Sequence, residues 1–275
     1  MILSLDFGAS TVDSVRIKNG TICTIKTFES LDIATHDLSA FFRESGEDIT
    51  GISRIRVTGG KSRIFPDEVF GISVSKVDEI EAIGRGGVFL FREESGVADG
   101  DFLVVSMGTG TCMVHVRATK GKLMCRHIGG TGVGGGTFLG LSREMLGETD
   151  IPHLLERFRR GDARKVDLSV GDIVGSGIGM ISADVTASHF GKLARPIDFH
   201  KNDLAAGIVN FIGQTIGVLA VFSAASVQAK HIILTGKLTR IEEILDIILS
   251  IGKMYSVKMV VPKNAEYVSA VGAGM

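Results

Sequence analysis

The stretch IGGTGVGGGTFLGL at Ile128–Leu141 follows closely on SMGTGT at Ser106–Thr111, and both are set against apolar runs. Glycine in ordered structure costs conformational entropy, so two clusters this dense are poorly explained as ordinary turns. Glycine also leaves backbone N–H groups bare, and these can curl around an anion and let it approach closely. The two stretches therefore predict a nucleotide-handling enzyme, with close packing of a helix on a sheet as the structural alternative.

Length and composition allow one large or two medium domains. The chain has 275 residues, of which 44% are hydrophobic and 22% charged, enough for a substantial core. Its formal net charge of -1 creates no overall field, so neither nucleic acid nor a membrane is expected as a partner. The start, MILSLDFGAS, lacks the basic region of a signal peptide.

Two further features predict a cytoplasmic location. The most apolar run, Ala205–Ala225, includes Asn210 and Gln214 and is rich in glycine and alanine, so we expect a buried helix rather than a membrane span. The cysteines are odd in number and lack metal-ligand spacing, which favours reduced, buried structural thiols. They are Cys23, Cys112 and Cys125.

The N-terminus predicts a β-hairpin. A short apolar strand, Met1–Asp6, passes through a small-residue turn into the β-branched stretch Val12–Lys18, and Asn19-Gly20 marks the next turn. The tip presents Asp6, Gly8, Ser10 and Thr11. Asp6 suits a hydrated Mg²⁺ ion and the other three suit phosphate contacts. The alternative is a plain hairpin whose acid caps a turn.

The same arrangement recurs in the middle of the chain. Phe102–Ser106 reads as a central strand that enters the turn Met107–Thr111 and returns through Met113–Arg117. The chain is thus predicted to be built twice, as two lobes that face a shared cleft. A further strand, Leu123–Ile128, leads into the glycine stretch, and Thr137 begins a helix. This stretch matches neither the Walker A nor the Rossmann fingerprint.

The remaining segments alternate between helices and short strands. A helix carries Asp78, Glu79 and Glu81 in its first turn and continues through Phe91, and acids there also suit the helix dipole. The polar turn Asp184–Gly191 could line a substrate pocket or cap a helix. We further expect helices at Leu31–Glu44, Ile151–Gly161, Asn202–Ala229 and Ala265–Gly274, and strands at Arg54–Thr58, His231–Leu234 and Val257–Val261.

Ordered motifs over nearly the whole chain resemble a known family. They are DFGAST at Asp6, VTGGKSRIF at Val57, VDEIEAIGRG at Val77, SMGTGT at Ser106, GGTGVGGGTFLGL at Gly129 and DVTASHFGK at Asp184. In this order they resemble the type II pantothenate kinases, which are related to acetate and sugar kinases, actin and heat-shock chaperone ATPases. The resemblance implies an α/β, two-lobed, duplicated actin-like ATPase fold with ribonuclease-H-like lobes and a central cleft.

The same resemblance implies domain limits and site residues. Residues 1–98 form the N-terminal lobe and residues 99–275 the C-terminal lobe, with the last short helix near the first lobe. Glu79 matches the catalytic acid that takes the proton from the pantothenate hydroxyl, and Asp6 matches the acid on the metal side. The expected cofactors are ATP and Mg²⁺. The residues implied for nucleotide are Asp6, Gly8, Ser10, Thr11, Gly108, Thr109, Gly110, Thr111, Gly132, Gly134, Gly135, Gly136, Thr137 and Gly236, and those for substrate are Arg126, His127, Gly129, Asp184 and Thr186.

Two positions depart from the family pattern. Asp13 stands where the first loop usually carries a lysine, and an acid repels a triphosphate. The family tends to place an arginine two residues before the glycine stretch, where this chain has His127, with Arg126 one residue upstream. Adjacent side chains of a strand point to opposite faces, so Arg126 serves only if the strand has a bulge.

The resemblance implies phosphorylation of pantothenate, the first step towards coenzyme A, by a homodimer, and a coenzyme A thioester is a further candidate partner. A second interpretation keeps the ATP site and changes the acceptor to pantetheine, a sugar or an N-acyl amine. A third is a non-catalytic protein that binds nucleotide or acyl-coenzyme A and regulates a partner.

Overall fold

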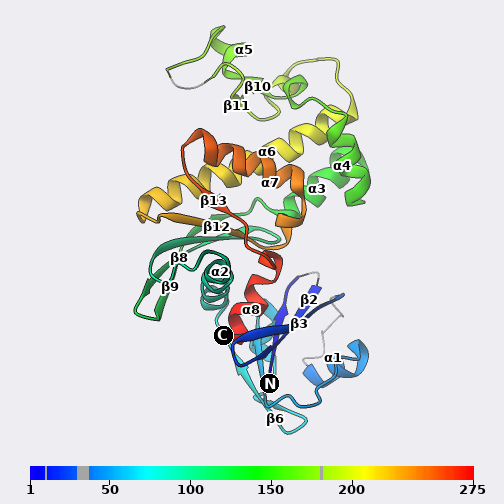
Figure 1. Cartoon of the computed structure of the whole chain (residues 1–275). Coiled ribbons are helices and arrows are strands. Elements are labelled where there is room, and N and C mark those ends of the chain that lie inside the picture. The colour runs from blue at the N-terminus through cyan, green and yellow to red at the C-terminus, as the bar shows by residue number, and fades with distance from the viewer. Residues whose placement is uncertain (10, 30–36, 180–181) are drawn as a thin grey trace.

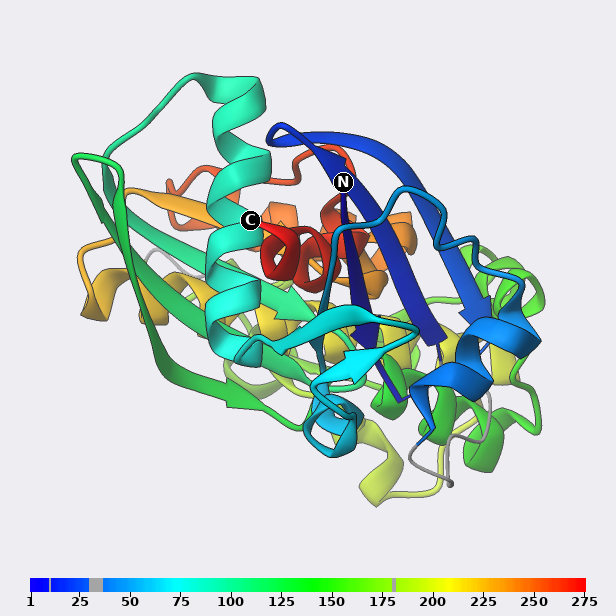
Figure 2. The same ribbon diagram turned by 90° about the horizontal axis from the view of Figure 1, so that it is seen from below.

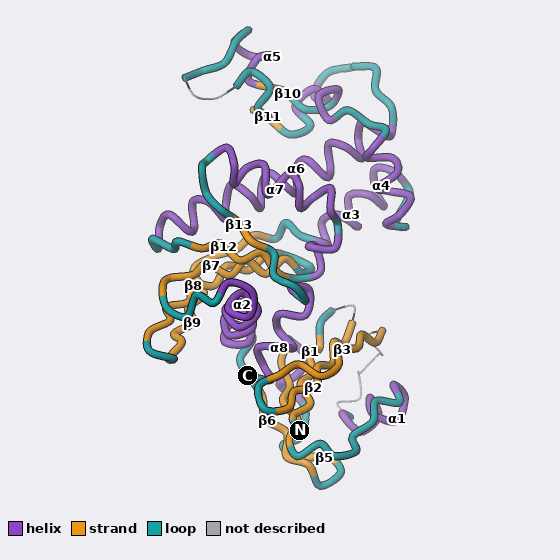
Figure 3. The backbone as a smooth tube through the Cα atoms, viewed as in Figure 1, coloured by secondary structure: helices purple, strands orange, loops and turns teal. Residues whose placement is uncertain are grey.

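The computed structural model describes residues 1–9, 11–29, 37–179 and 182–275. These residues form two α/β halves, each built on its own sheet, with the N-terminal half below the C-terminal half in Figure 1. Figure 3 shows that the orange strands of the two halves are separate groups, and that helices lie between and above them.

The first half begins with the predicted hairpin. Its sheet has the strand order β3-β2-β1-β4-β6-β5 over the described residues, and β1, β4 and β6 run parallel. The strands are β1 (Ile2–Phe7), β2 (Thr11–Lys18), β3 (Thr21–Glu29), β4 (Arg54–Thr58), β5 (Glu68–Val69) and β6 (Ile72–Lys76). One face buries a phenylalanine cluster under α1 (Leu38–Ser45), in which the rings of Phe7, Phe41 and Phe65 are in contact.

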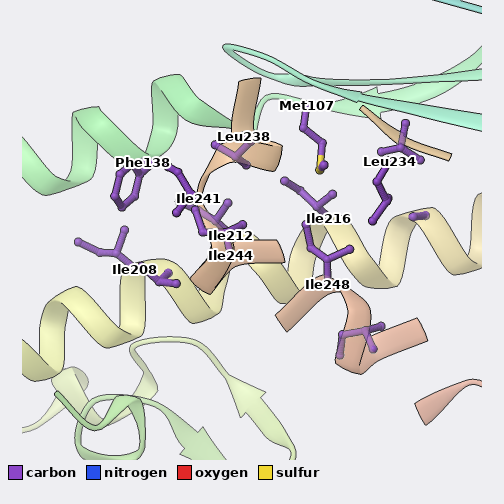
Figure 4. Close-up of a cluster of buried hydrophobic side chains, with 14 of the residues drawn as sticks. Met107, Phe138, Ile208, Ile212, Ile216, Leu234, Leu238, Ile241, Ile244 and Ile248 are labelled. Atoms are coloured by element: carbon purple, nitrogen blue, oxygen red, sulfur yellow. The ribbon is translucent and has the colours of Figure 1, made fainter. Parts of the chain in front are cut away.

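The second half has the order β13-β12-β7-β8-β9 over the described residues, with β7, β12 and β13 parallel. Its strands are β7 (Gly100–Met107), β8 (Thr111–Thr119), β9 (Lys122–Thr131), β12 (His231–Thr235) and β13 (Met259–Val260). One face is covered by α3 (Gly135–Leu146), α6 (Lys201–Ser226) and α7 (Glu242–Met254). Figure 4 shows their side chains meeting those of β7 and β12 in one apolar cluster.

The two sheets repeat one topology. An antiparallel meander of three strands is followed by two parallel strands in each, so that β1, β2, β3, β4 and β6 correspond to β7, β8, β9, β12 and β13. The prediction of a duplicated, two-lobed α/β fold is confirmed.

Two helices join the halves. The helix α8 (Val268–Gly274) lies between α2 (Glu79–Ser95) and the strands of the first sheet (Figure 2). A Cβ on Gly272 would stand 1.8 Å from the carbonyl oxygen of Ala82, so only glycine permits this approach. The other side of α2 packs on the second sheet. The boundary at 98/99 stays a prediction, because α2 contacts both halves.

The long helix α6 is the predicted buried helix. By length and composition alone it could cross a membrane, but 67% of its most apolar window is buried inside the protein. It packs against α3, α4 (Ile151–Arg159) and α7 and against the second sheet. Its apolar character therefore serves the core of the second half.

A peripheral segment lies on the other side of α6, away from the first half (Figures 1 and 3). It follows α4 (Ile151–Arg159), which confirms the helix predicted at Ile151–Gly161 to within two residues at its end. The segment consists of η2 (Ala163–Lys165), β10 (Leu168–Ser169), α5 (Val170–Val174), β11 (Thr186–Ser188) and η3 (Gly191–Ala194).

A few predicted boundaries differ from the structure. The helix expected at Leu31–Glu44 begins at Leu38, where the side chain of Asp37 caps it, and residues 31–36 lie outside the described residues. The strand expected at Val257–Val261 is reduced to β13, because only its two residues pair with β12. The helix expected from Thr137 starts two residues earlier, at Gly135.

Candidate active site

The site is framed by a turn that occurs once in each half. The strand β4 ends in Thr58 and runs into η1 (Gly60–Ile64) through TGGKSRI, whereas β12 ends in Thr235 and runs into η4 (Lys237–Arg240) through TGKLTRI. The central glycines, Gly59 and Gly236, have φ of 88° and 91°. A Cβ on either would lie 2.5 Å from a backbone oxygen of the adjacent hairpin strand, so glycine is required at both.

The first hairpin turn, between β1 and β2, carries part of the predicted nucleotide site. The amide of Gly8 donates to the carbonyl of Thr11 at 3.0 Å and closes the turn. Ser10 lies outside the described residues. Asp6 is the penultimate residue of β1, beside the turn, and a Cβ on Gly59 would meet its Oδ1 at 2.7 Å. Asp6 therefore lies where β1, β4 and the first glycine turn come together.

The second hairpin turn is closed in the same way, because Gly108 N donates to Gly110 O at 2.9 Å. The start of α3 then packs on it: Gly135 N donates to Gly108 O at 2.8 Å and Gly136 N donates to Thr109 O at 2.9 Å. The dense glycines thus allow one loop to lie on the other. The amides of Gly135 and Gly136 are thus used to pack the start of α3 on the hairpin turn. For these two glycines the structural alternative of the sequence analysis, close packing, applies.

Other loop groups are engaged within the loop as well. The hydroxyl of Thr111 donates to Val133 O and that of Thr137 to Gly132 O, both at 2.8 Å. The amides of Thr109 and Gly110 donate to no acceptor in the part of the chain that the structure describes. These two amides are therefore the available phosphate donors of this turn.

Three acids converge beside the turns. Burial, and then the charges of Asp13 and Glu79, raise the pKa of Asp6 to about 7. The charge of Lys237 and a hydrogen bond from Ser269 act in the opposite direction. Burial and the charge of Glu79 also raise the pKa of the Cys112 thiol to about 11, which leaves that thiol protonated. Glu79 therefore lies near the ends of both β1 and β8.

A cavity of about 320 Å³ is bordered by Glu79. Asp78 caps α2 by accepting from the amides of Ile80 and Glu81 at 2.9 and 3.2 Å, which sets Glu79 in the first helical turn with its side chain exposed. The cavity is lined by Gly59, Gly60, Ser62, Arg63, Lys76, Val77, Asp78 and Glu79. The site thus places a carboxylate beside a space that an acceptor molecule can enter.

The strand β9 contains a bulge, the feature that Arg126 needs if it is to take the place of the family's arginine. Its register shifts between Met113 and Val114, where Ile128 is the extra residue. Val114 packs in the cluster under α2 and pairs with His127, so His127 shares the face of the sheet on which α2 and Glu79 lie. Arg126 precedes the bulge and points to the opposite face. Gly129, directly after the extra residue, has φ +153°, a conformation that residues other than glycine rarely adopt.

The other predicted substrate residues are not brought to this site. Asp184 and Thr186 belong to the peripheral segment beyond α6 (Figure 1). Thr186 Oγ1 accepts from the side chains of Asn210 and Gln214 at 3.2 and 3.1 Å, which holds the segment on α6. Cys23 is exposed, contrary to the expectation of a buried thiol, because β3 is the edge strand of its sheet.

One site residue has no precedent in the sequence analysis. Lys237 Nζ forms an ion pair with Asp13 Oδ1 at 2.7 Å, across 224 positions of sequence. Thr27 donates to the same carboxylate oxygen at 2.8 Å. The acid that departs from the family pattern is therefore matched by a cation from the other half. The signal in the sequence was the repeated TG turn, whose two copies differ in carrying Gly60 and Lys237.

Solved structures with this fold include nucleotide-bound proteins. The activator of the 2-hydroxyisocaproyl-CoA dehydratase from Clostridium difficile with bound ADPNP has a TM-score of 0.61 at 16% identity, over 99% of this chain and 92% of that one. A ROK family glucokinase from Streptomyces griseus in complex with glucose and AMPPNP has a TM-score of 0.58 at 14% identity, over 99% and 97%. The chain therefore has the two-lobed, duplicated α/β fold that was predicted as actin-like.

The family follows from sequence. A family model described as Fumble matches residues 100–275, and the chain belongs to the Fumble family. It is 27% identical to the type II pantothenate kinase of Oceanobacillus iheyensis over 98% of this chain and 97% of that protein. It is 31% identical to that of Bacillus cereus over 68% and 67%. The predicted resemblance to type II pantothenate kinases is confirmed.

Proposed function

We propose that the protein transfers the γ-phosphoryl group of ATP to the hydroxyl of pantothenate, forming 4'-phosphopantothenate, the first step of coenzyme A biosynthesis. The observation that carries the proposal is Glu79, which borders a cavity lined by the glycine turn of the first half and whose charge acts on Asp6. The relatives' name, type II pantothenate kinase, supports the reaction, and the nucleotide analogues bound by proteins of the same fold support ATP as donor.

Glu79 acts as the general base. Its carboxylate takes the proton from the acceptor hydroxyl as that oxygen attacks the γ-phosphorus, and the bond to the ADP oxygen breaks. Its place in the first turn of α2 leaves the carboxylate exposed to the cavity. A base in this position contributes roughly 10²- to 10⁴-fold to the rate, or about 3 to 5 kcal/mol of barrier.

The phosphates lie between the hairpin turns. The amides of Thr109 and Gly110, which lack acceptors within the described residues, are directed to phosphate oxygens. The crowded carboxylate of Asp6 is a hard oxygen donor that fits Mg²⁺, and the bound ion would neutralise phosphate charge. The described residues hold no group of three or more His, Cys, Asp or Glu for a metal, which suits an ion held by one carboxylate, phosphate and water.

The cations of the cavity favour pantothenate over neutral acceptors. Arg63 and Lys76 border the same cavity as Glu79, and Lys76 also pairs with Asp67 at 3.2 Å. Pantothenate carries a carboxylate, which these cations attract, whereas pantetheine and sugars carry none. The second candidate function is a kinase with the same ATP site and a neutral hydroxyl acceptor. Such an acceptor has no carboxylate for these cations to attract.

The test measures ADP release with pantothenate for the wild type, Glu79→Gln and Glu81→Gln. We expect Glu79→Gln to lower kcat by roughly 10²- to 10⁴-fold, because it removes the base. Glu81 is the matched control: it stands in the same helical turn but pairs with Arg85 outside the cavity lining, and its variant should keep the wild-type rate. An unchanged rate in Glu79→Gln would remove Glu79 from this role.

The acceptor is decided by a panel at fixed ATP. Pantothenate, pantetheine and a hexose are compared with the wild type, and we expect the highest kcat/KM for pantothenate. A higher value for a neutral acceptor would select the second candidate, and ATP binding without turnover on any acceptor would select the regulatory alternative. The homodimer, the response to coenzyme A thioesters and the cytoplasmic location stay predictions, and light scattering of the purified chain tests the first.

A further inference from the structure

An ion pair crosses the cleft between the halves. Asp13, on β2 of the first sheet, has a side chain that is 5% exposed, whereas the side chain of its partner Lys237 is 33% exposed. The acid is therefore buried, whereas part of the lysine side chain stays accessible. An ammonium group has three donors, and only one of them is needed for the 2.7 Å contact with Asp13.

The backbone around Lys237 holds this cation where the two hairpin turns meet. Gly236 lies against Met107 at the end of β7, directly before the turn that carries Thr109 and Gly110. On its other side, Leu238 is buried in the core between α3, α6 and α7 (Figure 4). The position of Lys237 is thus set by two anchored neighbours, while its long side chain spans to the first hairpin.

The acids near Lys237 favour a cation at its position, because an anionic nucleotide would otherwise meet negative charges alone. The charges of Asp13 and Glu79 act on Asp6, and the charge of Lys237 acts on it in the opposite direction. A nucleotide adds several negative charges to this group, and the repulsion between like charges opposes its binding. The next cation along the turn, Arg240, is directed elsewhere, to Glu266 and to the hydroxyl of Tyr267.

Resting on the proposed kinase function, we propose that Lys237 binds a terminal phosphate of the nucleotide from across the cleft, and that Asp13 positions its ammonium group for this contact. Asp13 then supports nucleotide binding, because it holds a cation from the second half beside the phosphates. The cation of the first phosphate turn is supplied by the opposite lobe.

The test compares the affinities for Mg²⁺–ATP and for AMP by calorimetry in the wild type, Lys237→Met and Lys237→Arg. We expect Lys237→Met to weaken ATP binding by roughly 10- to 100-fold, the range of a hydrogen bond to a charged group. AMP lacks the terminal phosphates, so its affinity should change by less than about 3-fold. Lys237→Arg keeps the charge and should recover part of the ATP affinity.

Lys237→Met also leaves Asp13 buried without its cation, which is destabilising. The double variant Asp13→Asn/Lys237→Met removes both charges, so it should regain stability while ATP binding stays weak. Wild-type ATP affinity in the double variant would overturn the proposal, because the lysine would then only neutralise Asp13. Equal losses for ATP and AMP would overturn it as well.

Arg240→Met is the matched control, since Arg240 lies on the same turn as Lys237 and both cations lie over the Tyr267 ring, at 5.4 and 5.6 Å. We expect the wild-type ratio of ATP to AMP affinity in this variant, and a ratio lowered as in Lys237→Met would contradict a specific role for Lys237. Turnover with pantothenate is measured separately on the wild type. Its absence would remove the proposed acceptor but would leave the comparison of ATP with AMP valid.

Discussion

The TGGKSRI turn of the first half and the TGKLTRI turn of the second have the same backbone and different tasks. In both, a hydroxyl donates to the carbonyl of the turn glycine at 2.7 Å: Ser62 to Gly59 and Thr239 to Gly236. The first copy continues with Gly60 and borders the cavity at Glu79. The second places Lys237 at that point and reaches Asp13. A duplicated backbone thus supplies a space on one side of the cleft and a cation on the other.

Substitution of the two turn glycines, Gly59 and Gly236, should have the largest effect on stability. Gly59→Ala and Gly236→Ala should each lower the free energy of unfolding by on the order of 3 kcal/mol or more, because positive φ and a 2.5 Å backbone contact coincide at both. Urea unfolding measures the loss. Gly60→Ala is the control, since a Cβ there meets nothing within 4 Å. A loss at only one of the two sites would show that the turns are not equivalent.

The two halves differ in charge at one corresponding position: β1 carries Asp6 near its end, whereas β7 carries Ser106 there. The folded pKa of Asp6, about 7, lies above its usual 3.8, so the folded state binds the proton more tightly than the unfolded state. Stability of the free protein should therefore rise as pH falls through 7, by about 1.4 kcal/mol from pH 8 to pH 6 for this group.

The measurement is the free energy of unfolding at each pH for the wild type and Asp6→Asn, without nucleotide or metal. The difference between their pH profiles isolates Asp6 from the other titrating groups. Parallel profiles would show that Asp6 titrates in its ordinary range in the folded protein.

Removing the hydrogen bonds from the hydroxyls of Ser62 and Thr239 to the turn glycines should have the smallest effects on stability. Ser62 is 4% exposed and Thr239 is half-buried. Ser62→Ala should cost about 1 kcal/mol and Thr239→Val less, because water replaces the lost partner more easily at the exposed site. Thermal unfolding of both variants measures the difference, and the reverse order would mean that burial does not set the cost of this bond.

Local patterns predicted much of the fold. The alternation and turn residues of the hairpins at Asp6 and Ser106 indicated both sheets and their duplication, because pairing in a short hairpin depends on nearby residues. The capped start of α2 likewise placed Glu79 at the first turn of a helix. The peripheral position of Thr186 was not predictable, because a polar turn has the same composition in a pocket as on a surface.

The sequence by itself determined the two hairpins, the two glycine turns and the family, since these depend on residues close together in the chain. Tertiary structure alone decided that the amides of Gly135 and Gly136 donate to the SMGTGT turn, that the bulge at Ile128 turns His127 rather than Arg126 towards α2, and that Asp13 meets Lys237. The physical reason is distance along the chain: the first two depend on packing within the second half and the third on the docking of both halves, and the local pattern at either end is compatible with many other partners.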